Sequence, residues 1–256
     1  MVMLLTSGLA GAAGNADDLA KATANPVADL ISVPLQSNWD TGYGPENKTQ
    51  YTLNVQPVIP FRLNADWNLI SRTIIPVINQ PGLSAGQNDV WGIGDIVQSL
   101  FFSPRATSGG LIWGAGPVLL LPTANDNRLG LDRWGAGPTG VVLKQANAWT
   151  YGALANHLWS FAGDGPQKVN VSYMNPFVTY SLGGGWSNTL QTEVTYNWEA
   201  RNGQRTTMPI SYGVARVLTL GGQPMSVGVT YKHYVETPRG QPDWGLRFVV
   251  SFLFPR

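Results

Sequence analysis

Few side chains in this sequence could support acid–base or nucleophilic chemistry. The 256 residues include only two histidines, His157 and His233, and no cysteine. A zinc centre usually draws several ligands from these two residue types, and a disulfide framework or a thiol nucleophile needs cysteine. The sequence also lacks GxSxG, phosphate-loop and HExxH patterns. We therefore expect no catalytic residues, no metal site and no cofactor.

One set of residues nevertheless suggests hydrolysis. Asn156, His157 and Ser160 lie close together in the chain, and an imidazole beside a hydroxyl can activate it as a nucleophile. Outer-membrane phospholipases use such an Asn-His-Ser set on their lipid-facing wall. Adjacent residues of a strand point to opposite faces, so Asn156 cannot orient His157 directly. We interpret His157 as an interface residue beside Trp159 and Phe161, with a lipid-acting enzyme as the alternative.

The segment 124–133 contains four side chains with oxygen atoms that calcium accepts as ligands. These are Asn125, Asp126, Asn127 and Asp132. Their spacing does not fit an EF-hand, so we interpret them as the polar surface of a solvated loop.

Charged side chains inside predicted strands are more informative. A charge on the lipid face near the bilayer midplane costs about 2–4 kcal/mol for Arg or Lys, so these residues should face a lumen. Two interpretations stay open: ion pairs that fill a small barrel, or a selectivity filter. With Gln191, which shares a face with Glu193, the candidate lumen-lining residues are Arg72, Asp95, Gln191, Glu193, Lys232 and Arg247.

The elements that would position these residues follow from the composition. Charged residues make up only 12% of the chain, against 30 glycines, 10 tryptophans and 9 tyrosines. This balance is typical of a membrane barrel, whose strands meet lipid and whose tryptophans and tyrosines lie at the water boundary. Lys and Arg total 16 against 15 Asp and Glu, so we expect no nucleic-acid partner.

Short alternating segments separated by turn residues run through the chain. Their connections alternate in length: those at 79–89 and 124–133 are long and polar, while those at 64–66 and 145–147 are short. Barrels have short periplasmic turns and longer extracellular loops. We therefore predict an all-β protein, a transmembrane antiparallel up-and-down β-barrel of about twelve strands with both ends in the periplasm. The predicted strands are 30–39, 50–62, 67–78, 90–102, 111–123, 134–144, 148–161, 169–181, 186–198, 206–218, 225–235 and 243–254.

Alternation within the predicted strands indicates which side chains meet lipid. Between 186 and 198 the even positions include Trp186, Leu190 and Trp198, whereas the odd positions, including Gln191 and Glu193, are all polar. The polar set should line a wet lumen. Residues 148–161 and 169–181 do not sort cleanly, so their facing stays open.

The two ends of the chain carry signals of export. Residues 1–16 are predicted to be a signal peptide with a cut after Ala16, although a basic n-region is missing. Residues 17–29 form a short periplasmic segment, either a helix that plugs the barrel or a disordered tail, and residues 30–256 form the barrel. In the last strand Phe248, Phe252 and Phe254 share one face. This pattern resembles the signal read by the barrel-assembly machinery.

Several motifs together resemble a known bacterial family. Among them are NPVADLISVPLQ, WNLISRTIIPVI, WGAGPVLLLPTA and WTYGALANHLWS. They are similar to outer-membrane barrels grouped with MetA-pathway phenol-degradation proteins and often labelled transporters. The resemblance covers residues 17–256. By kinship with hydrocarbon-uptake channels it implies passage of small aromatic or apolar compounds, and it supplies no binding or catalytic residues.

The expected function is therefore a passive channel in the bacterial outer membrane, and not an enzyme. A phospholipase-like enzyme and a structural or adhesive barrel with a closed lumen are the alternatives. The expected partners are outer-membrane lipid, the barrel-assembly machinery and a small solute whose identity the sequence does not give.

Overall fold

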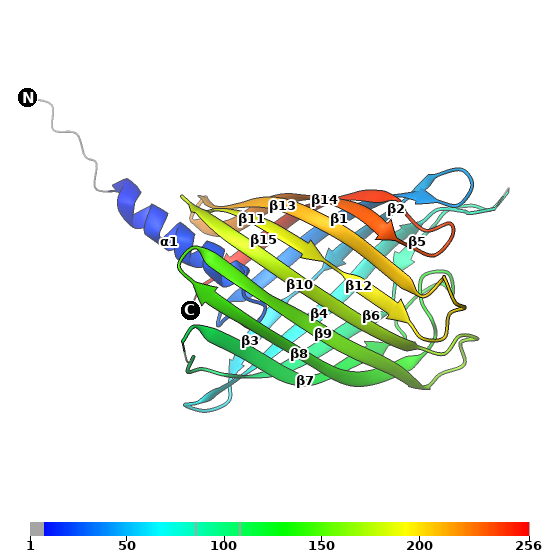
Figure 1. The fold of residues 1–256 in the computed structure, drawn as a ribbon, viewed down its shortest axis with the longest axis horizontal. Coiled ribbons are helices and arrows are strands. Elements are labelled where there is room, and N and C mark those ends of the chain that lie inside the picture. Colours follow the sequence, from blue (N-terminus) through cyan, green and yellow to red (C-terminus); the bar gives the residue numbers. More distant parts are fainter. Residues whose placement is uncertain (1–7, 85, 108, 256) are drawn as a thin grey trace, which may run out of the picture.

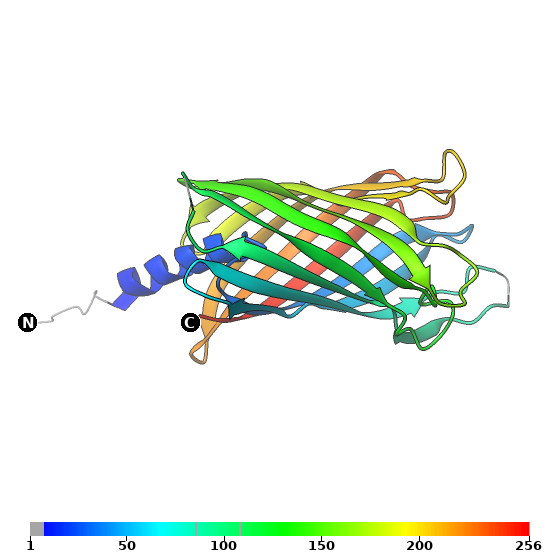
Figure 2. The same ribbon diagram turned by 90° about the horizontal axis from the view of Figure 1, so that it is seen from below.

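One closed antiparallel sheet forms the protein wall (Figures 1 and 2). The computed structural model describes residues 8–84, 86–107 and 109–255. The first strand, β1 (Ile31–Tyr43), pairs with the last, β15 (Trp244–Phe254), from Ile31 opposite Phe254 to Thr41 opposite Trp244. This pairing leaves the sheet without an edge, as a wall inside lipid requires. The predicted all-β barrel is confirmed.

Fifteen strands fill twelve positions around the wall, because three positions are interrupted. In the first interrupted position Gln56 and Pro57 separate two short strands, and both strands keep the same residue register against β1. Proline has no amide hydrogen to donate to the ladder. Gly94 and Asp95 separate the second pair, and Glu193 separates the third. The interrupted pairs are β2 (Lys48–Val55) with β3 (Val58–Arg62), β5 (Val90–Ile93) with β6 (Ile96–Pro104), and β11 (Trp186–Thr192) with β12 (Val194–Asn197).

The connections alternate in length, as predicted. Those at 81–89, 122–133 and 198–205 lie at one end of the barrel, and the two-residue turns 147–148, 184–185 and 221–222 lie at the other. This is the pattern of extracellular loops and periplasmic turns. The remaining strands are β4 (Trp67–Gln80), β7 (Leu111–Leu121), β8 (Trp134–Ala146), β9 (Trp149–Ala162), β10 (Asn170–Gly183), β13 (Thr206–Leu220) and β14 (Gln223–Glu236).

Large apolar side chains cover the outside of the wall. Leu190 and Trp198 are half exposed, whereas Ser187 on the opposite face is buried. The structure also fixes the facing of β9 and β10, which the sequence left open. Trp159 of β9 is exposed while Leu154 is buried inside the barrel. Phe248 and Phe254 of β15 are exposed too. Recognition of this last strand by the assembly machinery stays a prediction.

The N-terminal segment lies at the end with the short turns, where the C-terminus also lies (Figures 1 and 2). Its helix α1 (Gly8–Thr23) continues across the predicted cut after Ala16. Residues 1–7 of the predicted signal peptide lie outside the described residues. Within the part of the chain that the structure describes, no helix is both long and apolar enough to cross a membrane.

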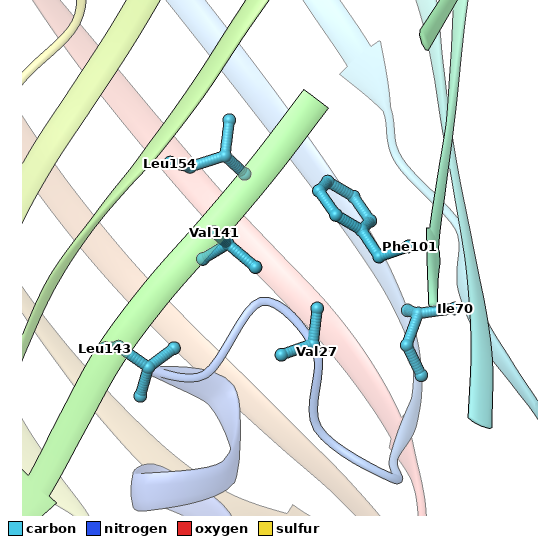
Figure 3. Close-up of a cluster of buried hydrophobic side chains, with 6 residues drawn as sticks. All are labelled: Val27, Ile70, Phe101, Val141, Leu143 and Leu154. Atoms are coloured by element: carbon cyan, nitrogen blue, oxygen red, sulfur yellow. The ribbon is translucent and has the colours of Figure 1, made fainter. Parts of the chain in front are cut away.

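Two apolar clusters fix the segment after Ala16 to the inside of the barrel. Leu19 and Ala20 of α1 pack with Leu30, Val217 and Leu253. Beyond the helix the chain enters the lumen. There Val27 lies among side chains from four strands, namely Ile70, Phe101, Val141, Leu143 and Leu154 (Figure 3).

The alternating connections predict which sites are reachable from outside the cell. Peptide tags inserted at Asp126–Asn127 or at Gly203 should be labelled on intact cells, because both sites lie in loops at the extracellular end. Tags at Ala65 or Gly184 should be labelled only after the outer membrane is permeabilised. Heat-modifiable gel mobility of each variant is the control for assembly. Labelling in the reverse pattern would mean that the barrel has the opposite orientation.

Candidate functional site: the lumen

Five charged side chains meet inside the barrel, and we call them the charged layer: Asp40, Arg72, Glu193, Lys232 and Arg247. The ion pair Glu193–Arg247 has an Oε2–Nη2 distance of 2.8 Å, and Lys232–Asp40 has an Nζ–Oδ1 distance of 2.5 Å. Arg72 of β4 lies inside the same lumen, where it lines a cavity. Because Glu193 follows β11 and Arg247 lies in β15, the first pair crosses the lumen between non-neighbouring strands.

Asn38 connects the two ion pairs. Its Oδ1 accepts hydrogen bonds from Arg247 Nε at 2.7 Å and from Lys232 Nζ at 3.3 Å. The hydroxyl of Tyr234 donates to Asp40 Oδ1 at 2.9 Å. The Lys232 side chain is only 3% exposed, so little water can replace a lost partner.

A missing side chain makes the Lys232–Asp40 pair possible. Gly245 of β15 lies opposite Lys232 on one side and opposite Asp40 on the other. A Cβ atom there would lie 2.1 Å from Asp40 Oδ1 and 2.9 Å from Lys232 Cε. Glycine at this position therefore lets the lysine reach across β15 to the strand beyond.

Arg72 differs from the other two cations of the layer. Its Nη2 donates to Gln56 Oε1 at 3.1 Å. Among the described residues no carboxylate lies within ion-pair distance of it. The layer therefore holds three cations and two carboxylates, with one positive charge in excess.

Two adjoining cavities lie in the lumen between the charged layer and the N-terminal segment. Their volumes are about 290 Å³ and about 180 Å³. Arg247 and Gln191 line the larger one, and Arg72 lines the smaller one. Small side chains keep the larger cavity open: Cβ atoms on Gly213 and Gly228 would approach neighbouring side chains to 2.6 Å and 2.9 Å. The side chains that line both cavities are Thr23, Pro26, Pro34, Gln36, Asn175 and Ser251.

Asp95 lies apart from the other predicted lumen residues. It follows the break between β5 and β6, and its carboxylate accepts the amide hydrogens of Ala124 at 3.2 Å and Leu131 at 2.6 Å. The strand is interrupted there because Pro76 of β4 lies opposite and has no amide hydrogen. Asp95 therefore anchors the loop 122–133 at the extracellular end.

The sequence alone did not identify four residues that contact the charged layer or belong to it, namely Asn38, Asp40, Tyr173 and Tyr234. Asn38 and Asp40 are buried, and Trp39 between them is exposed. This polar–aromatic–polar alternation would have placed both residues on the inner face. Tyr173 Oη donates to Glu193 Oε1 at 3.5 Å between neighbouring strands, and Tyr234 reaches Asp40 across β15. These contacts depend on the register between strands, which no signal within one strand shows.

The suggested hydrolytic set is not assembled. Ser160 Oγ accepts the amide hydrogen of Val169, and Asn156 lies on the opposite face of β9 from His157. On the outer wall His157 Nδ1 instead lies 2.8 Å from Ser172 Oγ, to which Trp198 Nε1 also donates. Within the described chain His157 Nε2 has no hydrogen-bond partner, so nothing orients the imidazole as a general base.

Two of the four loop side chains at 124–133 accept hydrogen bonds from the protein itself. Asn125 Oδ1 accepts the amide hydrogen of Ile93 at 2.9 Å. Arg128 donates its amide hydrogen to Asp126 Oδ1 at 2.9 Å and its Nε to the same oxygen at 3.3 Å. The backbone bond, followed by the side-chain bond, holds the pKa of Asp126 below its ordinary value. Among the described residues no three His, Cys, Asp or Glu side chains gather in one place.

The similarity to known proteins lies in the fold. Searches of family models and of curated proteins find no match. An outer-membrane channel from Pseudomonas putida F1 matches with a TM-score of 0.68 and 16% identity, over 88% of this chain and 96% of that chain. The NanC porin matches with a TM-score of 0.57 and 10% identity, over 88% of this chain and 100% of the porin. The fold is that of bacterial outer-membrane β-barrels, and the narrower MetA-pathway grouping is not confirmed.

The role of Gly245 can be tested by adding one methyl group. Gly245→Ala should displace Asp40 from Lys232 and lower the free energy of unfolding by about 3 kcal/mol, the order of a broken buried ion pair. Gly140→Ala is the matched control, because the only atom within 4 Å of its added Cβ is a carbonyl oxygen at 3.7 Å. Urea unfolding in lipid vesicles, followed by gel mobility, measures both. Equal stability of the two variants would show that the pair does not depend on this gap.

Proposed function

We propose that the protein is a passive channel for small molecules across the outer membrane. The unfilled lumen carries this proposal. A barrel of this size can fill its interior with side chains, yet two adjoining cavities of about 290 and 180 Å³ lie between the charged layer and the N-terminal segment. A purely structural barrel would have no need of this space. The glycines and short hydroxyl side chains that line it are the residues that leave room for a solute.

We propose that residues 17–29 restrict the periplasmic mouth. Few polar contacts hold this segment: Gly185 donates its amide hydrogen to Asp17 Oδ1 at 2.6 Å, and Gln145 Nε2 donates to Lys21 O at 2.9 Å. Val27 adds an apolar anchor against β4, β6, β8 and β9. The other contacts of the segment are apolar, through the clusters around Leu19 and Val27, so side chains join it to the wall and the strand ladder does not depend on it.

Small apolar or aromatic molecules are the solutes that we propose. The sequence resemblance to barrels grouped with phenol-degradation proteins supports this, as do the apolar side chains on the cavity walls. Phe177 and Val249 line the larger cavity, and Leu154 lines the smaller one. We propose no enzymatic activity, because the His157–Ser172 contact lacks a group to orient the imidazole.

Solute uptake by reconstituted protein tests both proposals. Liposomes that contain the full chain should swell in small neutral and aromatic solutes. Deletion of residues 17–28 should raise single-channel conductance several-fold, because the segment no longer occupies the mouth. Lys21→Ala is the control that keeps the segment and its backbone bond to Gln145, and it should conduct like wild type. Liposomes that never swell with either protein would contradict the channel proposal. Equal conductance of wild type and the deletion would contradict the plug.

A further inference from the structure

Among the described residues, the charged side chains that line the two cavities are all cationic. Arg247 lines the larger cavity and Arg72 the smaller one, and among the described residues no Asp or Glu lines either. The carboxylates of the charged layer are engaged elsewhere: Glu193 in its pair with Arg247, and Asp40 with Lys232. A solute in this space therefore meets guanidinium groups and no competing negative wall.

Arg72 is the cation available to a ligand. Among the described residues its side chain makes one hydrogen bond, to the neutral Gln56 amide, at 3.1 Å. A guanidinium has five N–H donors in a planar fork that matches a carboxylate. Arg247 already uses Nε and both terminal nitrogens for Asn38 and Glu193. It contributes mainly charge, whereas Arg72 has donors to spare.

Apolar side chains line the same space, and one of them, Val58, is the direct cross-strand partner of Arg72. Phe177 packs against the buried cluster around Val27 and lines the larger cavity. Val58 packs against the same cluster and lines the smaller cavity together with Leu154. The amide side chains of Gln36 and Asn175 line both cavities. The space thus places a guanidinium for an anionic group next to apolar side chains that suit a small hydrocarbon body.

We propose that the lumen binds small organic acids that carry one carboxylate and an apolar or aromatic body. The carboxylate lies on Arg72, with Arg247 adding positive charge, and the body lies against Phe177, Leu154 and Val58. This assignment rests on the proposed channel function and narrows its solutes, the small apolar or aromatic molecules, to those that carry one carboxylate. Passage of cations of the same size is disfavoured by the excess positive charge of the layer.

Benzoate is a suitable probe, with benzyl alcohol as its neutral counterpart and benzylamine as its cationic one. Calorimetric titration of the detergent-folded full chain should show saturable binding of benzoate, with binding of the other two at least tenfold weaker. Arg72→Gln should weaken benzoate binding about tenfold, the loss of one charge-assisted contact. Lys144→Gln makes the same charge change on the outer wall and should leave benzoate binding as in wild type.

A second variant neutralises Arg72 without removing it. Gln56→Glu places a carboxylate about where the amide oxygen now accepts from Arg72 Nη2, so it should compete with benzoate and abolish its binding while the barrel still assembles. Heat-modifiable mobility verifies assembly of each variant. Benzoate binding that is unchanged in both variants overturns the assignment, as does equal binding of benzyl alcohol. Equal binding of inorganic phosphate overturns the role of the apolar wall.

Conductance in planar bilayers tests the carboxylate site separately from the proposed channel function. Benzoate should block potassium chloride current in wild type at concentrations where benzyl alcohol has no effect, and the block should be weaker in Arg72→Gln. A conducting channel that is insensitive to benzoate overturns the solute assignment alone. Protein that binds benzoate in detergent but never conducts overturns the channel function and leaves the carboxylate site in place.

Discussion

Hydrocarbon offers no hydrogen bonds, so every amide of the wall has to find its partner within the wall. This constraint closes β1 onto β15 and dictates the alternation of side chains between lipid and lumen. It also explains where the wall departs from regularity. At each of the three strand breaks a polar side chain faces other polar groups of the protein: Gln56 contacts Arg72, Asp95 holds two loop amides, and Glu193 pairs with Arg247. Prolines in or beside these strands interrupt the ladder where such groups lie.

The lumen has two chemically different halves. β4, β6, β8 and β9 contribute the apolar cluster around Val27, while β10, β11, β13, β14 and β15 contribute mostly hydroxyl, amide and glycine positions. The N-terminal segment packs into the apolar half because burial of Val27 removes hydrocarbon from water. The larger cavity lies in the polar half, where side chains are small, whereas the smaller one reaches Val58 and Leu154 in the apolar half. The division of the lumen explains how one short segment can occupy the barrel without filling it.

Much of the wall could be predicted from the sequence, because successive side chains of a strand point to opposite faces. In a closed barrel one face meets lipid and the other meets the lumen, so the two faces differ in polarity. The twelve positions, the alternating connections and the facing of β11 with β12 follow from that rule. β9 and β10 did not follow, since Ala, Gly, Ser and Asn occur on both of their faces. Asp95 was predicted to face the lumen because the interruption between β5 and β6 beside it leaves no mark in the alternation of polar and apolar residues. The partners of Glu193 and Lys232 depend on the curvature of the whole sheet, which is absent from any one segment.

The charged layer spans the seam where the barrel closes. Asp40 and Asn38 belong to β1, while Lys232 and Arg247 belong to β14 and β15, so their contacts can form only when the first and last strands meet. In a chain with an open seam, Lys232 would keep its charge next to Gly245 with no carboxylate beside it. The closed barrel therefore gains the Lys232–Asp40 ion pair and the hydrogen bonds to Asn38 together with its last ladder of backbone hydrogen bonds.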